Sequence, residues 1–163
     1  MSVSSNDIEA IKKQIGRTPR GLIDISYRCK CGNPAVVKTK PSVEGNEPFP
    51  THFYLTCAKL NSQIGTLEAS GLMKEYEEKL SLDKDFAEQY KKAHLDYLKR
   101  RNEHGFIEEI AEISAGGMPK RVKCLHALIA HSLAVGPGIN PVGDDALQRL
   151  GNWGNKSCIE ENK

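Results

Sequence analysis

Residues 120–135 constrain the fold more than any other segment, because they are apolar on nearly every side after the first turn. A helix without a polar face is stable only when other elements cover it all round. Pro119 suits the start of such a helix, and Gly136-Pro-Gly138 would stop it. We therefore expect this helix at the centre of one domain, for which 163 residues with 39% apolar content suffice.

Strand and turn signals precede the apolar helix. Residues 21–39 surround a Gly32-Asn-Pro34 turn and predict a two-stranded hairpin, and residues 51–56 predict a third strand. Further helices are expected over residues 6–16, 64–80, 83–104 and 144–150. The sequence thus predicts an α+β protein, with a small antiparallel three-stranded unit at residues 21–57 packed on four to five helices. Residues 1–151 would form this single domain, and residues 152–163 a polar, flexible tail.

The cysteines predict a metal site. Their number, five, argues against a closed disulfide framework. Cys29 and Cys31 flank one residue at the hairpin, so both sulfurs can face one side of a strand, and Cys57 ends the next strand. With Cys124 as the fourth ligand, the four thiolates would form a closed tetrahedral site for zinc. Three alternatives stay open: buried core thiols, a redox dithiol, and an iron–sulfur cluster, which also accepts four thiolates.

The apolar helix supplies the fourth ligand of this predicted site. Cys124 and His126 would lie about 200° apart around a regular helix, so only one of them can reach an ion unless the first turn is irregular. We favour Cys124, which lies closer to the helix start, and place His126 second.

The residues before the apolar helix predict an anion site. Free amides at a helix start attract phosphate or carboxylate, and basic side chains strengthen that attraction. The residues concerned are Gly116, Gly117, Lys120, Arg121 and Lys123. The alternative is an ordinary helix start with solvated basic side chains. His126 and His131 are candidates for acid/base catalysis, with Asp144 or Asp145 as an orienting group, and a hydrogen-bonded core histidine is the alternative for each.

Several motifs together resemble a known family. They are Arg28-Cys29-Lys-Cys31-Gly32, Pro48-Phe-Pro-Thr51, Leu67-Glu-Ala-Ser-Gly71, Ala115-Gly-Gly-Met-Pro119 and Arg121-Val-Lys-Cys-Leu-His126. In this order they resemble the bacterial, mainly actinobacterial, family called domain of unknown function 501, over roughly residues 8–151. The resemblance implies no reaction, and Cys158 falls outside it.

Composition and charge limit the classes of function that this chain can have. The net charge of +2 argues against a nucleic-acid partner. Residues 1–10 lack the apolar stretch of a secretory signal, and residues 124–135 are too short to cross a bilayer, so we expect a cytoplasmic protein without membrane contact. Our first hypothesis is a zinc-binding accessory or interaction module. The second is an enzyme for a phosphorylated or anionic substrate at residues 116–123, and whether the chain is an enzyme at all stays open.

Overall fold

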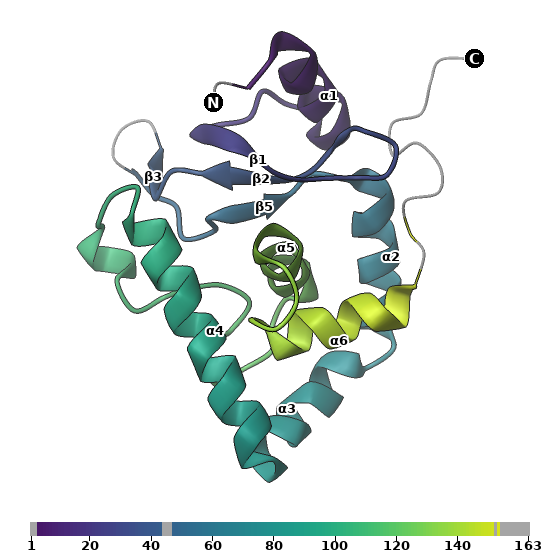
Figure 1. Ribbon diagram of the computed structural model, residues 1–163, viewed down its shortest axis with the longest axis vertical. Coiled ribbons are helices and arrows are strands. Elements are labelled where there is room, and N and C mark those ends of the chain that lie inside the picture. Colours follow the sequence, from purple (N-terminus) through teal and green to yellow (C-terminus); the bar gives the residue numbers. More distant parts are fainter. Residues whose placement is uncertain (1–2, 44–46, 152, 154–163) are drawn as a thin grey trace.

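A computed structural model describes residues 3–43, 47–151 and 153 of the chain (Figure 1). In chain order the elements are α1 (Ser5–Ile15), β1 (Leu22–Arg28), β2 (Pro34–Thr39), β3 (Ser42–Val43), β4 (Glu47–Pro48), β5 (Phe53–Leu55), α2 (Ala58–Ala69), α3 (Leu72–Leu82), α4 (Lys84–Asn102), the 3₁₀ turn η2 (Glu108–Ile110), α5 (Leu125–Val135) and α6 (Pro141–Leu150). The α+β class is confirmed. Of residues 152–163, expected to form a tail, all but Trp153 lie outside the described residues.

The three-stranded unit forms as the sequence predicts. Its strands follow the order β1-β2-β5, and both pairs are antiparallel. The hairpin turns at Gly32, whose φ of 92° favours glycine. The segment between the predicted hairpin and the third strand also contains the short pair β3-β4.

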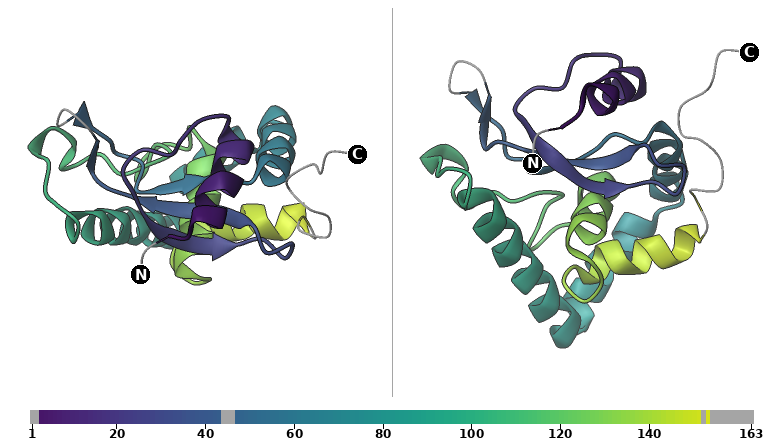
Figure 2. Two further views of the ribbon diagram at one scale, coloured as in Figure 1. Left: turned by 90° about the horizontal axis from the view of Figure 1, so that it is seen from above. Right: turned by 45° about the horizontal axis from the view of Figure 1, so that its top comes forward.

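Helix α5 lies beneath the sheet and is surrounded by other helices (Figures 1 and 2). The sheet covers it from above, α4 and α2 flank it, and α6 crosses it, while α1 lies on the outer face of the sheet. The buried face of α5 includes Leu125, Leu128, Ile129 and Ala130, all at 0% exposure. The central position predicted for the apolar segment is therefore correct.

The start of α5 differs from the prediction. The helix begins at Leu125 rather than at residue 120. The Arg121 amide donates to the Gly117 carbonyl at 2.8 Å, and the Lys123 amide donates to the Gly116 carbonyl at 2.7 Å. These bonds close a tight turn in which both glycines have positive φ, so residues 120–124 do not enter the helical ladder.

The helix expected over residues 64–80 is two helices. Its path breaks at Gly71, whose φ of 87° ends the helical conformation between α2 and α3. The described residues therefore contain six α-helices, against the four to five that were expected.

Buried Arg101 joins two segments of the chain and has no carboxylate partner among the described residues. Its Nη1 donates to the carbonyls of Pro50 and Ile113, and its Nη2 donates to the carbonyl of Ile110 at 2.6 Å. One guanidinium at 1% exposure thus fixes the loop after α4 against the segment before β5.

Helix α6 approaches α5 backbone to backbone at Gly143. A Cβ at this position would collide with Ser132 Oγ and with the carbonyl oxygen of Leu128, two atoms of α5. A glycine in mid-helix is otherwise unfavourable by about 1 kcal/mol, so close packing is the reason for this one.

We predict that Gly143→Ala lowers the free energy of unfolding by at least about 2 kcal/mol, because the backbones must separate. Gly65→Ala is the matched control, since a Cβ there meets nothing within 4 Å. The control should raise stability by up to about 1 kcal/mol. Urea unfolding measures both, and equal effects of the two substitutions would contradict the close approach.

His52 precedes β5 and is wholly buried, with 0% exposure. Its ring Nδ1 donates to the Thr39 carbonyl at 2.7 Å, while its backbone amide donates to the Tyr97 hydroxyl at 2.6 Å. The pKa of His52 is lowered to about 4, mainly by burial; the nearby His104 and Lys38 act in the same direction, and the bond to Thr39 opposes them. The ring is therefore neutral at neutral pH.

A pH dependence of stability follows from His52. Its folded pKa of about 4 lies below the ordinary 6.5, so its contribution is complete above pH 6.5 and is lost as pH falls toward 4. Relative to His52→Asn, the wild type should lose about 2 to 3 kcal/mol over this interval. Urea unfolding at several pH values tests this, and a constant difference between the two proteins would show that His52 titrates normally.

Candidate metal centre

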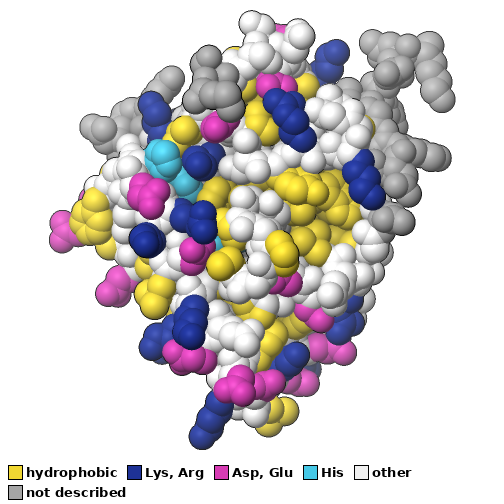
Figure 3. Space-filling view, in the orientation of Figure 1, with side chains coloured by type: hydrophobic (Ala, Val, Ile, Leu, Met, Phe, Trp, Pro, Cys, Tyr) yellow, Lys and Arg dark blue, Asp and Glu magenta, His cyan; other side chains and the backbone are white. Residues whose placement is uncertain are grey.

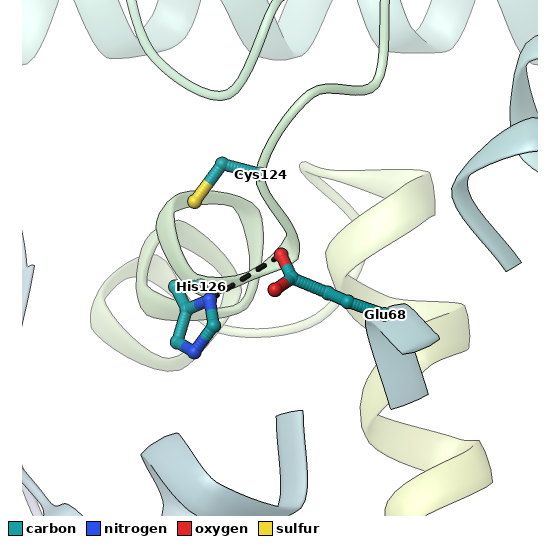
Figure 4. A group of neighbouring side chains, drawn as sticks. All are labelled: Glu68, Cys124 and His126. Carbon is teal, nitrogen blue, oxygen red and sulfur yellow. Dashed lines mark ion pairs between the residues drawn. The ribbon is translucent and has the colours of Figure 1, made fainter. Parts of the chain in front are cut away.

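Three potential metal ligands meet where α2 ends and α5 begins (Figure 4). Glu68 comes from the last turn of α2, Cys124 directly precedes α5, and His126 is its second residue. One ligand atom from each lies within 4.8 Å of those of the other two. All three side chains are partly buried, and Figure 4 shows them pointing toward one another.

The extended backbone at Cys124 allows this residue and His126 of α5 to reach one point. A regular helix would hold Cys124 and His126 about 200° apart. Cys124 instead has φ −151° and ψ 108° and stands just outside the helix. This is the irregular first turn under which both can be ligands.

Hydrogen bonds orient the other two members of the cluster. His126 Nε2 donates to the Asn61 carbonyl at 3.2 Å, which leaves Nδ1 facing Glu68 Oε2 at 3.3 Å. The same carboxylate oxygen accepts the Leu125 amide at 2.9 Å, the first amide of α5. The histidine and the glutamate are thus held by backbone groups on both helices.

The charges at this cluster favour a cation between its members. The hydrogen bond with Cys124 raises the pKa of His126 to about 9 despite burial, and the charge of Glu68 adds to this effect. Burial opposes ionisation of Cys124, but His126 and the Ala127 amide lower the pKa of this thiol below its ordinary value. The carboxylate of Glu68 and a thiol that ionises more readily than usual therefore favour a positive charge at Nδ1, where a metal ion could replace a proton.

The other predicted thiol ligands gather at the hairpin end of the sheet. Cys29 follows β1, Cys31 lies in the turn, and Cys57 caps α2 by accepting the Leu60 amide at 3.5 Å. Cys57 and Glu68 stand at opposite ends of α2, about 16 Å apart along its axis. The structure therefore brings Cys124 to Glu68 and His126, and zinc binding by Cys29, Cys31 and Cys57 stays a prediction.

The predicted anion loop has no helix start at Gly116 or Gly117. The nearby amide of Val122 donates to Glu77 at 2.9 Å, and Arg121 pairs with the same carboxylate at 2.7 Å. A Cβ at Gly116 would contact Leu128 at 2.8 Å, and one at Gly117 would contact the Arg121 backbone. The glycines therefore serve packing, while Lys120 and Lys123 are exposed.

His131 belongs to a buried network. Its Nε2 donates to Asp96 Oδ2 at 2.9 Å, and its Nδ1 accepts from Asn140 Nδ2 at 3.2 Å. Asn140 Oδ1 meanwhile accepts the Gly143 amide and caps α6. Asp96, rather than Asp144 or Asp145, is the carboxylate that orients this histidine, which stacks on Phe53 in the core.

We predict that Asn140→Ala lowers the free energy of unfolding by about 2 to 4 kcal/mol, because it removes a helix cap and a partner of buried His131. Asp83→Ala, which removes the cap of α4, is the matched control and should lose only about 1 kcal/mol. Chemical denaturation measures both. Equal losses would mean that His131 does not depend on Asn140.

The fold and this cluster define an α+β protein with a candidate thiol–imidazole–carboxylate metal centre. The model of the family described as "Protein of unknown function (DUF501)" matches residues 25–148, and the chain belongs to this family. The matched range contains all three residues of the cluster. No curated protein and no solved structure matches the chain. No helix among the described residues is long and apolar enough to span a membrane.

Proposed function

We propose that this protein binds one zinc ion through Glu68, Cys124 and His126. The observation that carries the proposal is the separation of 3.3 Å between His126 Nδ1 and Glu68 Oε2. Two ligands at 2.0 to 2.1 Å from a tetrahedral zinc ion lie about 3.3 Å apart. The two atoms are therefore already spaced as ligands of one ion.

The bond from His126 Nε2 to Asn61 supports the same proposal. Metal-binding histidines almost always donate their second ring nitrogen to a carbonyl or carboxylate, which fixes the tautomer that binds the ion. Here that bond selects Nδ1 as the ligand atom, on the side of Cys124 and Glu68.

The ligand set favours zinc among the common metals. One thiolate, one imidazole and one carboxylate form a mixed set that suits zinc, whereas calcium and magnesium prefer oxygen ligands alone. The side chains of His126 and Glu68 are 28% and 21% exposed, so an ion can reach them from solvent.

The ion would join the end of α2 to the start of the central helix. This position suits an accessory or interaction module that zinc stabilises, the role indicated by the sequence. Three protein ligands leave room for a fourth, which is water or a substrate in catalytic zinc sites. The identity of the fourth ligand therefore separates an interaction module from an enzyme.

The test is elemental mass spectrometry of protein purified without chelators or metal-affinity resin. We expect about one zinc per chain, and a loss of affinity beyond about 100-fold in Cys124→Ser and His126→Gln. His94→Gln is the matched control of His126→Gln and should keep the zinc, as should Glu75→Gln, which removes a carboxylate outside the cluster. The Cys29→Ser/Cys31→Ser double variant should keep it too.

Two outcomes would contradict the proposal. One is protein without zinc that also fails to take it up when reduced. The other is zinc kept in Cys124→Ser and lost in the Cys29→Ser/Cys31→Ser variant, which would place the ion at the hairpin. Cobalt substitution adds an independent reading, since the intensity of the thiolate charge-transfer band counts the sulfur ligands.

Zinc removal should also destabilise the protein. A ligand present at 100 to 1,000 times its Kd stabilises the folded state by about 2.7 to 4.1 kcal/mol. We expect EDTA to lower the free energy of unfolding of the wild type by this amount, and to leave His126→Gln unchanged. Equal effects on both proteins would mean that the ion is bound elsewhere.

A further inference from the structure

A polar pocket lies between the sheet and the end of α4, with a volume of about 270 Å³. Its wall includes Asp24, Ser26, Lys38, His52, Arg100 and Glu103. The wall also includes exposed His104, and Figure 3 shows histidine, basic and acidic side chains together on this part of the surface. Ala134 also lines the pocket and lies eight residues after His126, about 12 Å along α5, so the pocket is separate from the proposed zinc centre.

Two buried polar atoms of this wall have no partner among the described residues. One is Nε2 of His52, a side chain with 0% exposure, and the other is Oγ of Ser26. Because Nδ1 of His52 donates to the Thr39 carbonyl, Nε2 of the neutral ring is an acceptor. Buried polar atoms are nearly always paired, so these two indicate an occupant that brings hydrogen-bond donors.

The charged side chains of the wall indicate a ligand that carries both a positive and a negative charge. Lys38 and Glu103 form no ion pair with any residue of the described ranges. Asp24 stands opposite Lys38 on the neighbouring strand, and Arg100 uses its Nε for Asp96 at 2.8 Å. Unpaired positive and negative groups around one pocket match a zwitterion better than a simple anion or cation.

We propose that this pocket binds a free α-amino acid. Its carboxylate would face Lys38 and Arg100, and its ammonium group would donate to His52 Nε2 beside the carboxylates of Asp24 and Glu103. The volume lies below the range of about 300 to 1,000 Å³ typical of drug-sized ligands, which suits a molecule of this size. The site is independent of zinc.

The test titrates the full chain with each of the twenty standard amino acids, by calorimetry or by NMR. We expect at least one to bind with a Kd of about 1 mM or lower. Lys38→Gln should weaken its binding by at least about tenfold, because the carboxylate loses a charged partner. Lys40→Gln is the matched control, since Lys40 is exposed and outside the pocket wall.

His52→Asn tests the acceptor and keeps a donor for the Thr39 carbonyl. It should weaken binding by about tenfold, and His94→Asn, which alters a buried histidine outside the pocket wall, should not. The deaminated analogue of the bound amino acid should also bind about tenfold more weakly, because it lacks the ammonium donor. If His52→Asn does not fold, Lys38→Gln and the analogue still decide the matter.

Three results would overturn the proposal. In the first, none of the twenty amino acids binds below about 1 mM, and the pocket holds only solvent. In the second, binding survives Lys38→Gln unchanged. In the third, the deaminated analogue binds as well as the amino acid. His126→Gln should keep amino-acid binding, which makes this test independent of the outcome of the zinc experiments.

Discussion

The burial of most of α5 is the constraint on which the rest of the structure depends. A helix of eleven residues without a polar face must be enclosed, and the sheet, α2, α4 and α6 enclose it. The backbone N–H and C=O groups at the ends of a buried helix have no partner within the helix, so other residues must supply their hydrogen bonds. At the first turn Glu68 from α2 accepts the Leu125 amide, and that carboxylate becomes part of the candidate metal centre. Both proposed sites thus lie close to ends of the same buried helix.

Much of the fold could be predicted from local patterns. The lack of a polar face in residues 120–135 predicts that this helix lies at the centre of the fold. The Gly32-Asn-Pro34 turn predicts the hairpin. The start of α5 could not be predicted in this way, because Gly116 and Gly117 use their carbonyls to close a turn five residues before the helix. Pro119 fits a helix start and a tight turn equally well, so this residue alone does not decide between them.

The candidate site was predictable in part. Cys124 and His126 both stand out in the sequence, since thiols and imidazoles are few and lie near a helix start. Glu68 does not stand out, because it is one of 21 acidic residues and lies far from the other two along the chain. A Cys-x-His spacing at a helix boundary is the signal that could have indicated two metal ligands at the start of this helix, had the boundary been known. Only the tertiary structure, which packs α2 against α5, identifies Glu68 as the third ligand of the candidate site.

The contact between Glu68 of α2 and the first residues of α5 has a consequence for the order in which parts of the protein form during translation. Synthesis runs from the amino terminus, so the hairpin and α2 leave the ribosome long before Cys124 and His126. Until then Glu68 has neither the Leu125 amide nor the imidazole as a partner. The candidate centre can thus assemble only after the chain has been made past His126 and α5 has docked. An ion held there would mark a chain that extends past the start of α5, and a truncated chain that ends before α5 could not hold an ion at this cluster.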